Sequence, residues 1–215
     1  MVRLVLLPLF MLVVLLTACS SMYYSGLEKI GIPKRDVLVY RVEKARDTQR
    51  ETKQQFKSAL EQFTAVTRFD GGNLEKLYKK LNSEYEASVD KANEVKERIA
   101  DIESVSVALF REWETEITQY SNPALKRQSQ DKLVATRNHY RQLIIAMKNA
   151  ETRIQPVLSV FNDQVMYLKH NLNAQAITSL KSELGNLQSD VSTLIVSMEN
   201  SINEANRFLS NMEKN

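Results

Sequence analysis

The feature that most restricts the fold of this chain is a heptad spacing of apolar residues that continues from Lys34 almost to the C-terminus. Its first stretch steps by four and three through Leu38, Val42, Ala45, Gln49, Thr52, Phe56, Ala59, Phe63 and Val66. A 3.5-residue repeat of this kind is typical of helices that pack along one seam with left-handed supercoiling. The repeat therefore predicts an all-α fold built from long, mutually packed helices.

Turn-forming residues divide this pattern into four predicted helices, at about 34–68, 73–120, 123–171 and 174–213. Between the first two, Gly71 and Gly72 can adopt positive φ, and Asn73 is suited to cap the next helix. Asn122 and Pro123 form the same kind of start signal for the third helix. Glycine and proline are scarce elsewhere, so the helices are long, and the second and third would each extend about 70 Å.

The later helices carry seams of their own. These are Leu74, Tyr78, Leu81, Tyr85, Ser88, Ala92, Val95, Ile99, Ile102, Ser106, Leu109, Trp113, Glu116 and Tyr120 in the second, Leu133, Tyr140, Ile144, Met147, Ile154, Leu158, Phe161, Val165, Leu168 and Leu172 in the third, and Ile177, Leu180, Leu184, Leu187, Val191, Leu194, Met198, Ser201, Ala205, Phe208 and Met212 in the fourth. Polar seam residues such as Gln49, Thr52, Ser88 and Ser106 are expected to fix register. Pro156 is expected to bend the third helix, as a static bend in preference to a hinge.

Net charge alternates along the four predicted helices, at +4, −4, +5 and −3. In an up-down-up-down bundle each helix contacts its sequence neighbours and the fourth closes against the first. Every adjacent pair would then have opposite charge. A parallel dimer would instead place like-charged helices side by side, so we expect an elongated antiparallel bundle that is a monomer.

The N-terminus has the layout of a cleaved export signal. Arg3 precedes an uncharged apolar run of 13 residues, Leu4–Leu16, and two small residues follow at 17–18. The alternative is an uncleaved membrane anchor, but the run is short against the roughly 20 residues that a spanning helix needs. Pro8 also weakens a helix there. We therefore expect residues 1–18 to be removed.

The four residues 16–19, Leu-Thr-Ala-Cys, resemble the lipobox of bacterial lipoproteins, which implies lipid attachment to Cys19 and an N-terminal membrane anchor. Cys19 is the only cysteine, so the exported chain has no disulfide to form. Ser20, where aspartate commonly retains such proteins in the inner membrane, implies sorting to the periplasmic face of the outer membrane. Residues 19–33 would form a tether, in which Tyr23 and Tyr24 either anchor at the lipid headgroups or cap the end of the bundle.

No residue pattern points to a reaction, a cofactor or a metal. A helical-bundle metal site uses Glu three residues before His, but Thr136 and Tyr167 hold those places before His139 and His170. Glu112 and Glu116 share a helix face beside Trp113 and could serve as general acid and base, although a solvated charge run is the favoured interpretation. The processed chain has 28 basic against 26 acidic residues, which does not suggest nucleic acid as a partner. We expect a protein that is not an enzyme.

Together with the lipobox, the segment 24–36 (Tyr-Ser-Gly-Leu-Glu-Lys-Ile-Gly-Ile-Pro-Lys-Arg-Asp) and the heptad body at 34–215 resemble an uncharacterised family of Gram-negative lipoproteins. That resemblance implies no activity or site. The function expected is a lipid-anchored spacer, scaffold or adaptor for a protein partner in the cell envelope. The alternative is a membrane-remodelling or pore-forming bundle, against which the processed chain has no uncharged run approaching 18 residues.

Overall fold

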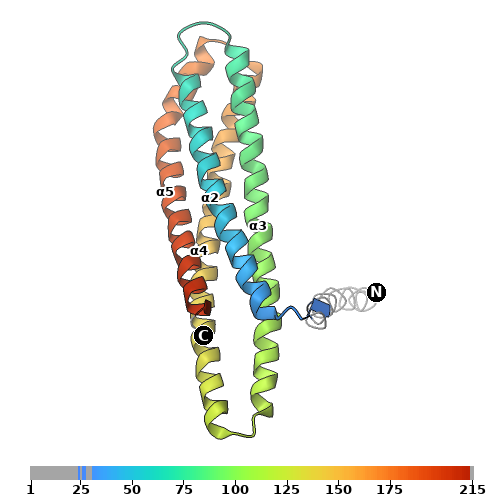
Figure 1. Cartoon of the computed structure of the whole chain (residues 1–215). Coiled ribbons are helices and arrows are strands. Elements are labelled where there is room, and N and C mark those ends of the chain that lie inside the picture. Colours follow the sequence, from blue (N-terminus) through green and yellow to red (C-terminus); the bar gives the residue numbers. More distant parts are fainter. Residues whose placement is uncertain (1–23, 25, 28–30, 214–215) are drawn as a thin grey trace, which may run out of the picture.

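The computed structural model describes residues 24, 26–27 and 31–213, which include four long helices arranged as an elongated antiparallel bundle (Figure 1). The helices are α2 (Lys34–Thr67), α3 (Leu74–Gln119), α4 (Pro123–His170) and α5 (Ala174–Glu213). Each bound agrees with its predicted position to within one residue. The prediction of an all-α bundle is therefore confirmed.

The turns use the residues that the sequence supplies for them. Gly71 and Gly72 have φ values of 148° and 104°, in the region that residues with a Cβ rarely adopt. The Asn73 side chain accepts a hydrogen bond from the backbone N–H of Lys76 at 2.9 Å and so caps α3. Asn122 accepts from two backbone N–H groups in the first turn of α4, whose first residue is Pro123. Local chemistry thus fixes where α3 and α4 begin.

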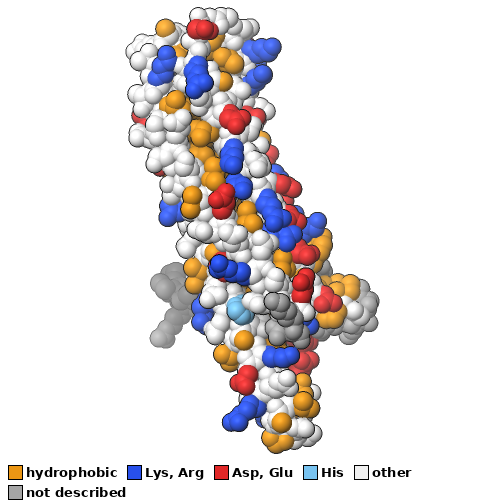
Figure 2. All heavy atoms as spheres, turned by 60° about the vertical axis from the view of Figure 1, so that its left-hand side comes forward, with side chains coloured by type: hydrophobic (Ala, Val, Ile, Leu, Met, Phe, Trp, Pro, Cys, Tyr) orange, Lys and Arg blue, Asp and Glu red, His pale blue; other side chains and the backbone are white. Residues whose placement is uncertain are grey.

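Each helix packs against its sequence neighbours, and α5 closes the bundle against α2, as the charge alternation predicts. Ion pairs bridge these faces. Arg41 of α2 contacts Asp101 of α3 at 2.9 Å, and Lys53 of α2 contacts Glu199 of α5 at 3.4 Å. On the face shown in Figure 2, basic and acidic side chains are interspersed along the length of the molecule. Single exposed pairs contribute only about 0–1 kcal/mol, so their main effect is on which helices associate.

The core follows the predicted seams most closely in α2, where all nine seam residues are buried. The polar seam residues Gln49, Thr52, Ser88 and Ser106 are buried as well. Thr52 donates to the backbone carbonyl of Thr48 at 2.7 Å. Among the described residues, however, the Gln49 amide and the Ser201 hydroxyl have no hydrogen-bond partner. The core of the bundle therefore contains buried polar groups that are only partly satisfied.

Three predicted seam positions are wrong. Glu116, Tyr120 and Leu172 are exposed in the structure. Leu172 lies after the end of α4, so no helix packs over it. Near its C-terminus α3 faces only α4, and its buried residue there is Ile117. The heptad count, which assumed neighbours on both sides, placed the seam one residue too early at this point.

Helix α4 continues through Pro156, whose side chain is exposed. Proline lacks the N–H that would bond to the carbonyl four residues earlier, and the exposed side of a helix tolerates that loss best because water reaches the carbonyl. The proline lies beside a shallow groove between α4 and α5, whose walls include Thr152 and Asp190. Helix α4 is continuous at this position, so the rod accommodates the proline without a break.

Candidate functional site

The four-helix section ends where α2 begins and α5 ends, and beyond this level α3 and α4 continue alone as a hairpin (Figure 1). Arg35 donates a hydrogen bond to the backbone carbonyl of Met212, which joins the start of α2 to the end of α5. The ammonium group of Lys34 lies 2.9 Å from a carboxylate oxygen of Glu112, which joins α2 to α3. We call residues 110–137 the projecting hairpin.

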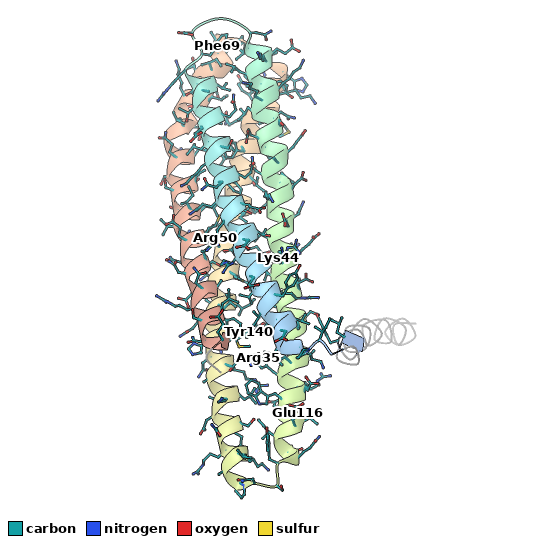
Figure 3. All side chains as sticks on the ribbon, in the orientation of Figure 1. Arg35, Lys44, Arg50, Phe69, Glu116 and Tyr140 are labelled. Carbon is teal, nitrogen blue, oxygen red and sulfur yellow. The ribbon has the colours of Figure 1, made fainter. Side chains whose placement is uncertain are left out.

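A pocket of about 200 Å³ lies at this junction. It is lined by Arg35, Leu109, Glu112, Trp113, Glu116, Lys132, Thr136 and Met212. Figure 3 shows Arg35 at the end of the four-helix section and Glu116 further along the hairpin. Two basic and two acidic side chains balance in its wall, so the pocket offers no net charge to attract a small ion.

Of the three acidic residues around Trp113, Glu112 and Glu114 form ion pairs with two other helices, α2 and α4. Glu112 pairs with Lys34, and Glu114 accepts a hydrogen bond from Arg137 of α4 at 2.6 Å. That hydrogen bond lowers the pKa of Glu114, whereas a carboxyl that acts as a general acid near neutral pH needs a raised pKa. Glu116 lines the pocket from an exposed position. The geometry is that of interhelical ion pairs.

The projecting hairpin has a small hydrophobic core of its own, separate from the main core. Its buried members are Phe110, Ile117 and Leu133. The indole N–H of Trp113 donates to the hydroxyl of Ser129 at 2.8 Å, and this bond ties α3 to α4. The rings of Phe110 and Tyr140 meet edge to face at 5.4 Å, and burial raises the pKa of the Tyr140 phenol. The buried core and the bond from Trp113 keep the two helices paired where α2 and α5 no longer cover them, while Tyr140, which also packs against the main core, lies at the base of the hairpin.

Tyr24 is packed onto the side of the bundle near this junction, with only 2% of its surface exposed. Its hydroxyl donates to the side chain of Ser104 in α3 at 3.0 Å. The guanidinium of Arg41 lies 5.5 Å from the centre of its ring, and the same guanidinium pairs with Asp101. Tyr24 therefore contacts the bundle, but on its side and not as the cap on its end that the sequence suggested.

The lipidation site predicted at Cys19 lies outside the described residues, as do the predicted signal at 1–18 and Tyr23. The structure does describe where Tyr24, five residues after Cys19, meets the bundle. It contacts Ser104 of α3 and Arg41 of α2, and not the far end of the rod.

The two histidines are far apart. His139 is half-buried beside α5, in a shallow pocket with Asn206 and Ser210. His170 is the last residue of α4, where a cation suits the helix dipole. Within the described part of the chain, no group of three or more His, Cys, Asp or Glu side chains is placed to hold a metal ion. No helix in that part is both long enough and apolar enough to cross a bilayer.

Sequence reasoning identified the Glu112–Glu116 group but missed Arg35, Lys132 and Met212, which complete the junction pocket. The signal that could have found them is helix length. Helices α3 and α4 have 46 and 48 residues, whereas α2 has 34 and α5 has 40. Two helices that are longer than their neighbours must project beyond the four-helix section. The ends of the shorter helices must then contact the longer helices at a junction.

Comparison with known proteins gives one family match. A family model described as "Protein of unknown function (DUF2959)" matches residues 23–212, which is nearly all of the chain after the predicted signal. No curated protein matches the chain. The matched range begins just before Tyr24 and ends at Met212, so it includes both the bundle and the segment packed against it.

Proposed function

The chain belongs to the family described as Protein of unknown function (DUF2959), and from that premise we propose that it is a non-enzymatic, lipid-anchored helical spacer or scaffold in the bacterial envelope. The lipid would be carried by Cys19 and the protein held at the periplasmic face of the outer membrane. The bundle, acting as a monomer, would present its length to a protein partner. The sequence supplies the argument for the anchor, and the structure supplies the argument for the rod.

The observation that carries the proposal is the attachment of Tyr24 to the bundle. A spacer works only if its anchor and its body are coupled, because a long flexible tether would let the body take any orientation. Tyr24 is buried five residues after Cys19 and is held by Ser104 and Arg41. A lipid on Cys19 would therefore be joined to a packed rod through a very short linker.

The surface supports a scaffold more than a catalyst. Of the acidic residues around Trp113, Glu112 is engaged by Lys34 and Glu114 by Arg137, and the junction pocket is small and balanced in charge. Exposed apolar residues are spread along the rod, as at Tyr40, Val134 and Val196. Scattered single residues of this kind are ordinary surface features, so the partner surface we propose is mainly polar.

The anchor is tested by Cys19→Ser in a Gram-negative host, followed by intact-mass measurement and membrane fractionation. Serine offers no thiolate to accept a lipid, so the variant should accumulate with residues 1–18 still attached. The parent should have the mass of a chain that begins at Cys19 plus its lipid. Normal processing and membrane association of the variant would refute the lipoprotein assignment.

The scaffold role is tested by photocrosslinking in intact cells from Tyr40, Val134 and Val196, which lie on three different helices and are all more than half exposed. A scaffold should give discrete crosslinked species from at least one of these positions. If all three positions gave only the uncrosslinked chain at its normal abundance, a protein-binding role for the rod would be contradicted.

A further inference from the structure

The end of the projecting hairpin differs in composition from the rest of the rod. Between Glu116 and Asp131 there is no acidic residue, and the only charged residues are Lys126 and Arg127. Two large apolar side chains are exposed beside them, Tyr120 at 43% and Leu125 at 49%. Figure 2 shows hydrophobic and basic side chains together at this narrow end of the molecule. We call residues 117–130 the hairpin end.

The position of Tyr24 determines how far a membrane can lie from this end. Cys19 precedes Tyr24 by five residues, which span at most about 18 Å when fully extended. From Ser104, where Tyr24 is bound, α3 continues to Gln119 over 15 residues, a rise of about 22 Å. In the other direction, the 30 residues back to Leu74 rise about 45 Å. The attachment point is therefore much closer to the hairpin end than to the opposite end.

These lengths exclude one orientation of an anchored rod. If the turn between α2 and α3 pointed toward the membrane, about 27 Å of four-helix bundle would have to lie below the membrane surface. That section carries exposed charged residues, including Lys76 and Lys80, whose burial in lipid is strongly unfavourable. A rod that points its hairpin at the membrane, or that lies along it, avoids this cost. Of these two, only the rod that points its hairpin at the membrane brings the hairpin end to the surface while the opposite end stays in water.

We propose that the hairpin end binds the headgroup region of the membrane that holds the lipid of Cys19, an inference that rests on the proposed lipid anchor. Tyrosine prefers this region because its ring is apolar and its hydroxyl is polar. Lys126 and Arg127 would meet anionic phospholipids, while Leu125 would reach the boundary of the acyl chains. The anchored protein would then touch the membrane at two points, and its orientation would be fixed.

The opposite end of the rod provides the comparison. There Leu172 is 42% exposed, nearly the same as Tyr120, and it also lies in a turn. The two turns at that end and the helix ends beside them carry Asp70 and Glu75 as well as Arg68, Lys76 and Lys169, so the charge there is mixed. A probe at Leu172 therefore matches one at Tyr120 in exposure and local structure, and differs in position and charge.

The test uses the full lipidated chain, reconstituted into vesicles of phosphatidylethanolamine and phosphatidylglycerol, some with brominated acyl chains. Trp113 is the only tryptophan, so Trp113→Phe/Tyr120→Trp and Trp113→Phe/Leu172→Trp each carry one probe. We expect the emission of the first to shift to shorter wavelength and to be quenched by bromine, and that of the second to remain as in water. Charge reversal by Lys126→Glu/Arg127→Glu should reduce the quenching at position 120.

Spin labels give the same comparison without altering Trp113. Each label is attached through a new cysteine, Tyr120→Cys in one variant and Leu172→Cys in the other. That cysteine is the only reactive thiol, because the lipid would consume the thiol of Cys19. The accessibility of the label to oxygen should rise on membrane binding only at position 120.

If the protein floats with the vesicles while both probes remain in water, or if both probes respond equally, the hairpin contact is refuted and the anchor stands. If Lys126→Glu/Arg127→Glu leaves the quenching of the tryptophan at position 120 unchanged, recognition of anionic lipid by these two residues is refuted. A chain that neither floats nor carries lipid mass would refute the anchor and, with it, this inference.

Discussion

The ring of Phe161 stands edge-on to the ring of Phe63 across the diagonal of the bundle, with their centroids 5.7 Å apart and their planes at 89°. Phe63 belongs to α2 and Phe161 to α4, two helices whose backbones do not approach each other in the described structure. Both side chains are completely buried. The pair fills the space between opposite corners of the bundle, so the four helices share one core instead of forming two separate pairs.

Phe161→Ala should lower the free energy of unfolding by about 3–5 kcal/mol, because it leaves a cavity that no single neighbouring helix can close. Tyr167→Ala is the control on the same helix, since Tyr167 is 38% exposed and its loss should change stability by less than about 0.5 kcal/mol. Urea unfolding monitored by circular dichroism measures both. Combining Phe161→Leu with Phe63→Leu should reveal a coupling of about 0.5–1.5 kcal/mol. Additive effects would show that the rings do not meet.

Gln49→Leu should stabilise the bundle by about 1–3 kcal/mol, because neither polar atom of the buried amide has a hydrogen-bond partner among the described residues. Gln55→Leu is the matched control on the same helix. The Gln55 amide donates to Glu84 at 2.7 Å, so this change should not stabilise the protein. Denaturant midpoints of the two variants provide the test. A loss of stability in Gln49→Leu would mean that the amide is satisfied in solution.

Gly185→Ala should raise the free energy of unfolding by about 1 kcal/mol, since Gly185 lies within α5 and the helix penalty of glycine is of that size. A Cβ at this position would have no atom within 4 Å, so no clash opposes the gain. Gly72→Ala should do the opposite, because the φ of 104° at this turn is strained for alanine. Thermal unfolding compares the two, and a decrease in Tm for Gly185→Ala would contradict the placement of this residue.

Stability should fall in acid partly through Glu94, whose carboxylate accepts hydrogen bonds from Lys91 at 2.9 Å and from Thr48 at 3.1 Å. The Lys91 contact is the main cause that lowers the pKa of Glu94 in the folded chain below its ordinary value of 4.5. Because the folded pKa is the lower one, the stabilisation is complete above the unfolded value and is lost as the pH falls through the folded value.

The measurement is urea unfolding of Glu94→Gln and of the parent, from neutral pH to pH values below the pKa of Glu94 in the folded chain. The difference in stability between the two should shrink as the pH falls. Glu97→Gln, which removes an exposed carboxylate from the same helix, controls for the loss of one negative charge. A difference between Glu94→Gln and the parent that stays constant across the range would show that the lowered pKa does not contribute.

The sequence by itself determined the helices and most of their contact faces. The caps at Asn73 and Asn122 and the glycines at 71–72 act within a few residues, so their effect can be read locally. The seam of α2 was equally readable, because that helix has neighbours along its whole length. Alternating net charge was enough to predict which helices pack side by side, since a ring of four allows every contact to join opposite signs.

Only the tertiary structure decided how the helices are offset along the rod. A heptad repeat indicates which face of a helix will be buried where a partner helix is present. It does not indicate where that partner helix ends. Glu116 and Tyr120 therefore continued the predicted seam yet are exposed, while Ile117 is buried against α4. The packing of Tyr24 on Ser104, 80 residues away in sequence, likewise depended on how α2 and α3 align. Periodicity along one chain carries no information about such an alignment, which is set when whole helical faces come together.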